Sequence, residues 1–451
     1  MQLPGEAVAR VLLRSPTRTL SRFPSNQSGT HMSSSITPSW GAKLLLVGYT
    51  SVHLGISLLW IGEEILGLYI MVRFLAISPG MAGGMFLASA LVNALCDGMV
   101  GRAIVRFAWL RRAIPWLSFL AILTASAGFA ALPLLAPNNL WTATLLLLLF
   151  RLSYSIADVP HNGLTRHLAA RGADLMAAKA RAIGSAVATL AIGFVAALIQ
   201  AGTGNDPYRA AVLASCVALA ALALMVPLPI LLRRDSLHVE TLETDLAPRG
   251  SPALWRFCAP TMLGLASIAA MGKALLHIDV IEGAIGPLAL LVTIVARLAA
   301  IWLWSPIARR IGNRQALGWA YAACGVTALL LPWTKSMGNA VALLLAWFGL
   351  GSGGVAFLSW AVLTEAIKRD GQSAAARFTA AFSVYTMATK IALGLAAMLV
   401  GSWLSLNNIS THADPQRFLM LGILVMLGCC LAGFAIAREP GHSPSSGFRD
   451  A

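Results

Sequence analysis

The chain has 451 residues, of which 58% are hydrophobic and only 11% charged, and its mean hydropathy is +0.75. These values exclude an ordinary water-soluble domain and predict an integral membrane protein embedded in a lipid bilayer. The net charge of +15 does not indicate a nucleic-acid partner, because the basic residues lie mainly in short connections between apolar runs.

The N-terminal segment differs from everything that follows. Residues 1–38 are rich in Ser and Thr and contain four arginines but a single acid, Glu6. Three interpretations remain open: an Arg-rich targeting segment, a disordered cytoplasmic tail, or an over-long reading frame whose true start is Met32. This segment therefore takes no part in the fold prediction.

Twelve apolar segments of about 20 residues or more follow, the length that a helix needs to cross a bilayer. We predict membrane-spanning helices at residues 43–73, 79–104, 114–136, 139–165, 178–202, 208–232, 253–277, 283–307, 315–334, 338–366, 374–403 and 416–437. The predicted fold class is thus an all-α membrane protein with twelve transmembrane helices.

The basic residues of the connections alternate strongly between the two sides of the membrane. One side carries eighteen: Arg102, Arg106, Arg111, Arg112, Arg166, Arg171, Lys179, Arg181, Arg233, Arg234, Arg249, Arg256, Arg309, Arg310, Arg314, Lys368, Arg369 and Arg377. The other side carries four: Arg73, Arg209, Lys335 and Arg417. Because Lys and Arg accumulate on the cytoplasmic side, we predict both termini in the cytoplasm and the protein in the plasma membrane or bacterial inner membrane.

The longest internal connection, residues 233–252, is polar and follows the sixth span. We interpret it as a cytoplasmic linker between an N-terminal six-helix bundle at 39–232 and a C-terminal bundle at 253–437, with a cytoplasmic tail at 438–451. The short basic connection PIARRIGNR after span eight is similar to the basic loop of the major facilitator superfamily, whose halves are related six-helix bundles.

Span four ends in FRLSYSIADVPHNGLTRH, a run that places four polar side chains on one helical face. Arg151, Ser155, Asp158 and Asn162 follow one another at steps of four, three and four residues. A charge in the middle of a bilayer costs about 2.5–3.5 kcal/mol on insertion scales, so this stripe should face the bundle interior or a watery cavity. The stripe is either a transport pathway or a buried structural ion-pair network.

Other spans also contain polar residues. Asn93 and Asp97 are one helical turn apart in span two, and Lys390 lies within span eleven. Carboxylate, amide and hydroxyl oxygens suit Na⁺ or a proton rather than a soft metal. A lysine in the membrane needs an anionic partner, and we predict that Asp97 and Asp158 converge on Lys390. Each residue alone could equally be a satisfied polar residue of the core.

Span one contains two adjacent acids, Glu63 and Glu64. Adjacent helical positions point about 100° apart. We therefore expect one acid to face the pathway and the other to face a helix interface or the outer membrane edge. Lys273, near the outer end of span seven, is expected to snorkel toward the membrane surface.

Four of these spans contain residues that match the motifs of one transporter family. Span four reads YSIADVPHN, from Tyr154 to Asn162, where one transporter family has Tyr-Thr-x-x-Asp/Asn-x-Pro-Tyr-Asn. Span five opens with Arg181 in RAIGS and span eleven has Lys390 in YTMATKIALG, where that family has an Arg and a Lys. Span two of the family has an acid, three further residues and then Asp-Pro. The chain therefore resembles the glycoside–pentoside–hexuronide:cation symporters, the melibiose-permease group of the major facilitator superfamily, over about residues 40–437.

The resemblance implies a site for a coupling cation and an adjoining site for a solute. The predicted cation-binding residues are Asn93, Asp97, Ser155, Asp158 and Lys390, and the predicted substrate-binding residues are Arg151, Tyr154, Asp158, Asn162, Arg181, Glu63 and Glu64. Three positions depart from the family. Asn93 replaces an acid, Gly98 replaces a proline, and Asn162 stands where melibiose permease has a sugar-contacting aromatic. We therefore do not expect a galactoside specifically.

The predicted function is a secondary active transporter that carries a small solute, such as a sugar or glycoside, together with Na⁺ or H⁺ by alternating access. Alternatives are transport of a lysolipid, an amino acid or another solute, and a non-transporting receptor or delivery protein on the same fold. An enzyme is not expected, because the sequence has no His-rich metal spacing, nucleophile elbow or phosphate loop. We expect a monomer with no cofactor and no metal beyond the possible Na⁺.

Overall fold

The computed structural model describes residues 40–170, 174–200, 206–235, 252–277, 286–336, 340–369, 375–406 and 415–438. All regular secondary structure within these ranges is helical, and twelve stretches are long and apolar enough to cross a membrane. The predicted all-α fold with twelve spans is therefore confirmed. The N-terminal segment 1–38, most of the linker and most of the C-terminal tail lie outside the described residues.

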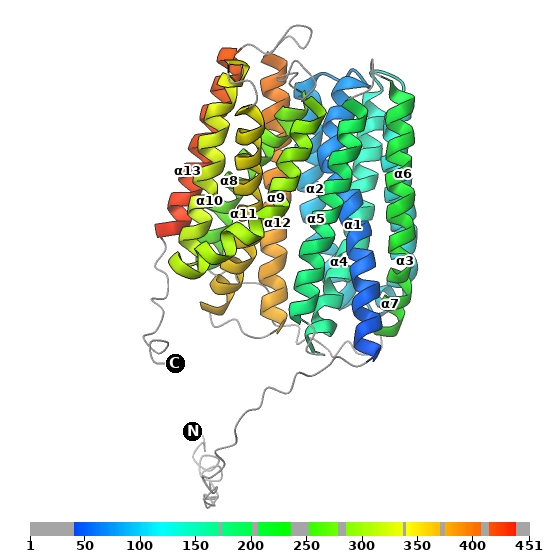
Figure 1. Ribbon diagram of the computed structural model, residues 1–451. Coiled ribbons are helices and arrows are strands. Elements are labelled where there is room, and N and C mark those ends of the chain that lie inside the picture. Colours follow the sequence, from blue (N-terminus) through cyan, green and yellow to red (C-terminus); the bar gives the residue numbers. More distant parts are fainter. Residues whose placement is uncertain are drawn as a thin grey trace, which may run out of the picture. The chain divides into compact units, whose positions relative to one another are not determined.

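We refer to α1–α7 as the N half and to α8–α13 as the C half (Figure 1). The N half consists of α1 (Trp40–Arg73), α2 (Pro79–Arg106), α3 (Ala108–Ala131), α4 (Leu140–Ala170), α5 (Asp174–Gln200), α6 (Pro207–Met225) and α7 (Pro227–Asp235), with the 3-10 turn η1 (Leu132–Leu134). The C half consists of α8 (Pro252–His277), α9 (Gly286–Ile311), α10 (Asn313–Leu330), α11 (Ala340–Arg369), α12 (Ala375–Leu406) and α13 (Pro415–Arg438), with the 3-10 turn η3 (Leu331–Ser336).

Most helices extend beyond the predicted spans into the basic connections. Helix α3 begins at Ala108 rather than at residue 114, and α4 continues to Ala170 rather than to residue 165. Hydropathy marks only the apolar part of a helix, whereas backbone hydrogen bonding continues through the polar turns that follow. The sixth span is divided at Val226, because Pro227 cannot donate the backbone hydrogen bond that would continue α6.

The basic connection between α9 and α10 depends on one glycine. Gly312 has φ = +89°, a conformation that residues with a side chain rarely adopt, and it directly precedes α10. The Asn313 side chain then donates a hydrogen bond to Glu365 of α11. This tight turn holds α9 and α10 antiparallel at the side that the charge pattern predicts to be cytoplasmic.

We call the side on which α1 ends and α2 begins the outer side, because the basic residues predict it to face away from the cytoplasm. The two halves meet along α2 with α12 and along α5 with α9 (Figure 1). At the outer ends, the Gly80 amide donates to the Ser405 hydroxyl at 2.8 Å. The Gln200 side chain of α5 donates to the Leu276 carbonyl of α8 at 3.0 Å. We refer to these contacts as the outer seam.

Small residues allow the closest approach in the outer seam. A Cβ atom placed on Gly83 of α2 would lie 2.6 Å from the Ala397 carbonyl oxygen of α12. Such contact between backbones is typical of membrane helices that pack through glycine, since van der Waals packing rather than the hydrophobic effect drives their association. The structure is therefore closed at the outer seam.

Candidate functional site

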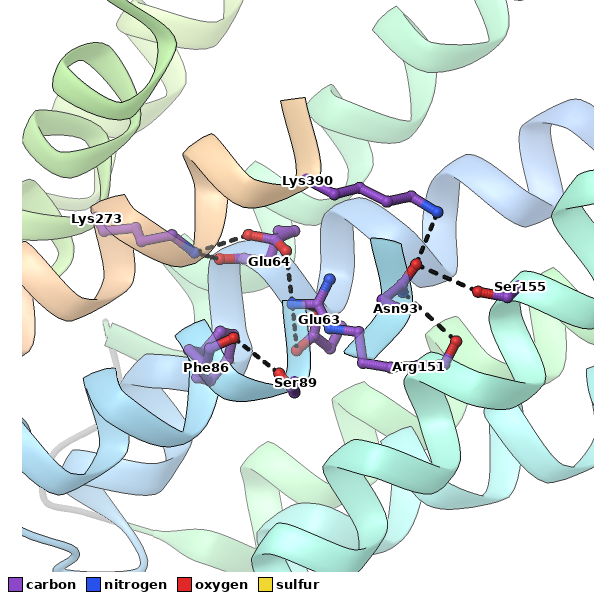
Figure 2. Close-up of polar contacts among 9 residues, drawn as sticks. All are labelled: Glu63, Glu64, Phe86, Ser89, Asn93, Arg151, Ser155, Lys273 and Lys390. Carbon is purple, nitrogen blue, oxygen red and sulfur yellow. Dashed lines mark hydrogen bonds and ion pairs between the residues drawn. The ribbon is translucent and has the colours of Figure 1, made fainter. Parts of the chain in front are cut away.

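Four charged side chains from three helices form a buried group that we call the outer cluster: Glu63 and Glu64 of α1, Arg151 of α4 and Lys273 of α8 (Figure 2). A single guanidinium nitrogen of Arg151, Nη2, lies 2.9 Å from Glu63 Oε2 and 2.6 Å from Glu64 Oε1. Lys273 Nζ lies 3.1 Å from Glu64 Oε2 and also donates to the Glu64 backbone carbonyl. The four side chains are at most 8% exposed, so solvent screens these interactions little.

Aromatic rings hold the Arg151 guanidinium in place. Its Cζ atom lies 4.6 Å from the centre of the Trp60 ring and 5.8 Å from that of Phe86. Arg151 Nε and Nη1 have no hydrogen-bond partner within the described part of the chain. One positive group thus serves two carboxylates through a single nitrogen.

The outer cluster corrects two predictions from the sequence. Glu63 and Glu64 do not point to separate environments, because both flexible side chains bend toward the same Arg151 nitrogen. Lys273 does not snorkel to the surface but lies buried against Glu64. Arg151 is fully buried and in this closed structure belongs to an ion-pair network, one of the two alternatives stated for the polar stripe, while its role in substrate binding stays a prediction.

A second group, which we call the middle cluster, consists of Asn93 and Asp97 of α2, Ser155 of α4 and Lys390 of α12. Figure 2 shows Asn93, Ser155 and Lys390 of this group. Lys390 Nζ donates to Asn93 Oδ1 at 2.7 Å and pairs with Asp97 Oδ2. Ser155 Oγ donates to the same Asn93 oxygen at 3.2 Å. Four of the five predicted cation-binding residues therefore lie in direct contact, and they join the two halves.

Asp158, the fifth, lies within electrostatic range of the middle cluster. It interacts with Lys390 and with Asp97, and it accepts a hydrogen bond from Asn162. Tyr154 lies one turn before it, and its ring centre is 5.5 Å from Lys390 Nζ. The polar stripe predicted on span four therefore extends from Arg151 of the outer cluster past the middle cluster.

The outer and middle clusters are also connected to each other. The Asn93 amide group donates to the Arg151 backbone carbonyl at 3.4 Å. The Trp60 ring faces both cations, since Lys390 Nζ lies 5.3 Å from its centre. A displacement of Lys390 or Arg151 would therefore change contacts in both the outer and the middle cluster.

A third group, the inner cluster, belongs to the N half and lies toward the opposite side. Arg181 of α5 donates to Asn162 Oδ1 at 2.8 Å and to the Tyr49 hydroxyl at 3.1 Å. The His161 ring stacks on Tyr49 with ring centres 4.6 Å apart, and His161 Nε2 lies 3.4 Å from His53 Nδ1. His53 Nε2 continues the chain of contacts to Ser185 at 3.1 Å.

Sequence reasoning identified Asn162 and Arg181 in the inner cluster but not its histidines as a pair. His53 and His161 lie on different helices, and neither has a neighbour in sequence that indicates the contact. The only indication of this contact in the sequence was that the two histidines lie on the polar faces of spans one and four. The pairing of Lys273 with Glu64 was missed for a similar reason, since Glu64 lies in the other half of the molecule.

The middle cluster contains one carboxylate oxygen that can bind a further group. Asp97 Oδ1 is buried and has no partner among the described residues, so it can accept a proton or a hydrogen bond. A metal cation at Asn93 and Asp97 would compete with the Lys390 ammonium for the same oxygens. Within the described residues, no three His, Cys, Asp or Glu side chains are grouped to hold a metal ion.

Residues 281–437 match a family model described as MFS/sugar transport protein. Among solved structures, the nucleoside transporter NupG gives a TM-score of 0.64 at 12% identity, over 87% of this chain and 98% of that chain. A bacterial homologue of the iron transporter ferroportin gives TM-scores of 0.57 in its inward-facing state and 0.56 in its outward-facing state. Both are 16% identical over 88% of this chain, and they are covered over 97% and 98% of their own length. No curated protein matches the chain.

The chain therefore has the twelve-helix fold of major facilitator superfamily transporters. The match at 281–437 supports, for these residues, the resemblance to sugar transporters of that superfamily that the motifs indicated. The nearly equal scores of the two ferroportin-homologue states show the fold and not the conformational state. The state is indicated instead by the contacts of the outer seam.

Proposed function

We propose that this protein is a secondary active transporter that moves a small polar solute, such as a sugar or related compound, by alternating access and couples it to a cation. The observation that carries the proposal is that acids of the N half meet lysines of the C half inside the membrane: Asp97 with Lys390 and Glu64 with Lys273. Charges in the bilayer are costly, and residues that keep them there usually mark a transport pathway. Rocking of the two halves would break and remake these pairs.

The solute site lies, in this proposal, between the middle and inner clusters. Asp158, Asn162 and Arg181 supply both acceptors and donors, while Tyr154 and Trp60 offer aromatic faces. Polar groups that fix orientation beside aromatic rings are what a site for a polar ring compound requires. The description of the matching family model as sugar transport favours the same class.

The coupling cation is, in this proposal, H⁺ or Na⁺ bound through Asp97 or Asp158. The unpartnered Asp97 Oδ1 supports such a role, since a buried carboxylate oxygen without a partner is costly. We further propose that the protein acts as a monomer in the plasma membrane or bacterial inner membrane, with both termini in the cytoplasm.

The test begins with a thermal-shift screen of the purified protein against sugars, nucleosides, amino acids and lysolipids, with and without Na⁺. A compound that binds only the folded protein raises the melting temperature. The compound with the largest shift is then used in counterflow, in which proteoliposomes preloaded with unlabelled solute accumulate the labelled form transiently.

The proposal predicts counterflow in the unmodified protein and at least a tenfold loss in Asp158→Asn. The matched control is Asp206→Asn, because Asp206 caps α6 in an exposed position and belongs to none of the three clusters. Saturable binding without counterflow would overturn the transport proposal in favour of a receptor. Counterflow that survives Asp158→Asn unchanged would move the solute site elsewhere.

A further inference from the structure

The net charge of the outer cluster depends on whether the two halves are in contact there. Glu63, Glu64 and Arg151 belong to the N half, whereas Lys273 belongs to the C half (Figure 2). With all four side chains ionised, the closed cluster is neutral. Without Lys273, two acids would face one base, and the cluster would carry one uncompensated negative charge.

Lys273 lies in the part of α8 that must move away from the N half when the outer seam opens. It lies on α8 three residues before Leu276, whose carbonyl accepts the Gln200 hydrogen bond in the outer seam. Its ammonium reaches Glu64 only because α8 and α1 approach each other there. Separation of the halves at the outer seam therefore withdraws Lys273 from Glu64.

The single positive charge of Arg151 cannot balance both acids once Lys273 is withdrawn. Its Nη2 atom already serves both carboxylates, at 2.9 Å and 2.6 Å. The Trp60 and Phe86 rings face its guanidinium group. A second positive charge would have to come from another residue.

The other described groups around the outer cluster do not supply that charge. From α2 the cluster is faced by the Phe86 ring, and the Ser89 hydroxyl there donates to the Phe86 carbonyl (Figure 2). From α8, His277 lies one turn beyond Lys273 and packs against Tyr69, with ring centres 5.4 Å apart. Lys390 of α12 is engaged by Asn93 and Asp97 of the middle cluster.

We propose that Glu63 and Glu64 together form a proton-binding site that fills when the outer seam opens and empties when Lys273 returns. The inference rests on the alternating access of the proposed function. An uncompensated carboxylate in an apolar environment is costly, and protonation removes the charge. In the open state one carboxylate oxygen takes up a proton from water. In the closed state that proton returns to water, and the Lys273 ammonium supplies the compensating positive charge.

Linkage fixes the sign of the pH dependence. The open state holds one more proton than the closed state, so lowering the pH must favour opening at the outer seam. A difference of one proton changes the ratio of open to closed molecules by up to about tenfold per pH unit. Proton binding from the outside would thereby prepare the transporter to receive solute from the same side.

The test measures the separation of the outer ends directly and needs no solute. Spin labels are attached at Trp141 of α4 and Leu343 of α11, both exposed at the outer ends of their helices, in a variant without the six native cysteines. Double electron–electron resonance then gives the label-to-label distance distribution in nanodiscs between about pH 5 and pH 9. We expect the population at long distance to grow as the pH falls.

Variants assign the effect to the outer cluster. Glu64→Gln, Glu63→Gln and Lys273→Met should each abolish the pH dependence, because each removes the difference in proton binding between the two states. Lys273→Arg keeps the positive charge and should keep the pH dependence, as should Asp206→Asn. Melting temperatures identify any variant that fails to fold, and the unmodified protein with Lys273→Arg still provides the test.

Several results would overturn the proposal. One is a distance distribution that does not change with pH, or that shows no opening in any variant. Another is a pH dependence that persists unchanged in Lys273→Met and Glu64→Gln, which would place the proton on another residue. Opening by Na⁺ at constant alkaline pH would replace the proton by a metal cation. Counterflow with no pH-driven opening would refute this inference alone, whereas pH-driven opening without counterflow would refute only the proposed transport.

Discussion

The outer and middle clusters use similar residues to join the same two halves, yet they differ in the number of charged groups. In the outer cluster two acids share one arginine of their own half and depend on Lys273 from the other half. In the middle cluster the position one turn before Asp97 is an amide, Asn93, so Lys390 of the other half balances Asp97 and no arginine takes part. When the halves separate, each cluster leaves one uncompensated negative charge on the N half. The comparison teaches that an amide in place of a second acid removes the need for an arginine from the same half.

The two clusters also differ in access. The side chains of the outer cluster are almost fully buried, whereas that of Asp97 is 13% exposed. Each cluster contains one buried carboxylate oxygen without a hydrogen-bond partner among the described residues, Glu63 Oε2 and Asp97 Oδ1. The burial of the outer cluster agrees with the proposal that it opens and closes with the seam, and the partial exposure of Asp97 agrees with the proposal that it binds the coupling cation.

The largest effect is expected from breaking the outer cluster at Arg151. Arg151→Met leaves two buried acids with one lysine from the other half, and removing one partner of a buried ion pair typically costs about 3–5 kcal/mol. The free energy of unfolding in mixed detergent micelles should fall by this amount. Arg151→Met combined with Glu63→Gln should recover part of the loss, because a single acid then pairs with Lys273. Full stability of Arg151→Met would show that the network is not needed for the fold.

A smaller effect is expected from removing the acid of the middle cluster. Asp97→Asn leaves the solute-facing groups of α4 and α5 in place, so counterflow should persist while uphill accumulation falls. Coupled binding typically changes affinity about 5- to 150-fold, and the effect of the cation on solute affinity should disappear to that extent. Solute uptake into proteoliposomes against pH and Na⁺ gradients measures both quantities. Intact uphill accumulation in Asp97→Asn would locate coupling elsewhere.

Much of this arrangement could be predicted from the sequence, but not every ion pair that joins the two halves. Hydropathy located all twelve spans, and helical spacing placed Asn93 with Asp97 and Ser155 with Asp158 on common faces. The pairing of Lys390 with Asp97 was predicted because a lysine in the membrane requires an acid. The partner of Lys273 was not predicted, because it depends on which helices of the two halves are neighbours. The convergence of Glu63 and Glu64 on Arg151 was also missed, because helical geometry fixes the Cβ direction and not the end of a long side chain.

A still smaller change would make the middle cluster resemble the outer one. Asn93→Asp gives two acids one turn apart facing one lysine, and such a pair is stabilised by an added cation. We expect the affinity for Na⁺ to rise by about tenfold, equivalent to about 1.4 kcal/mol. Thermal-shift titration with NaCl measures the change, and choline chloride controls for ionic strength. An unchanged response to Na⁺ would mean that Lys390 still satisfies both acids.

The most direct test of alternating access is to lock the outer seam. A Cβ atom on Gly80 would lie 3.9 Å from that of Ser405, a separation suited to a disulfide. The double variant Gly80→Cys with Ser405→Cys, without the native cysteines, should lose counterflow on oxidation and regain it on reduction. Each single variant should remain active throughout. Undiminished counterflow with the disulfide fully formed would contradict the account, because solute would then cross without separation of the two halves at the outer seam.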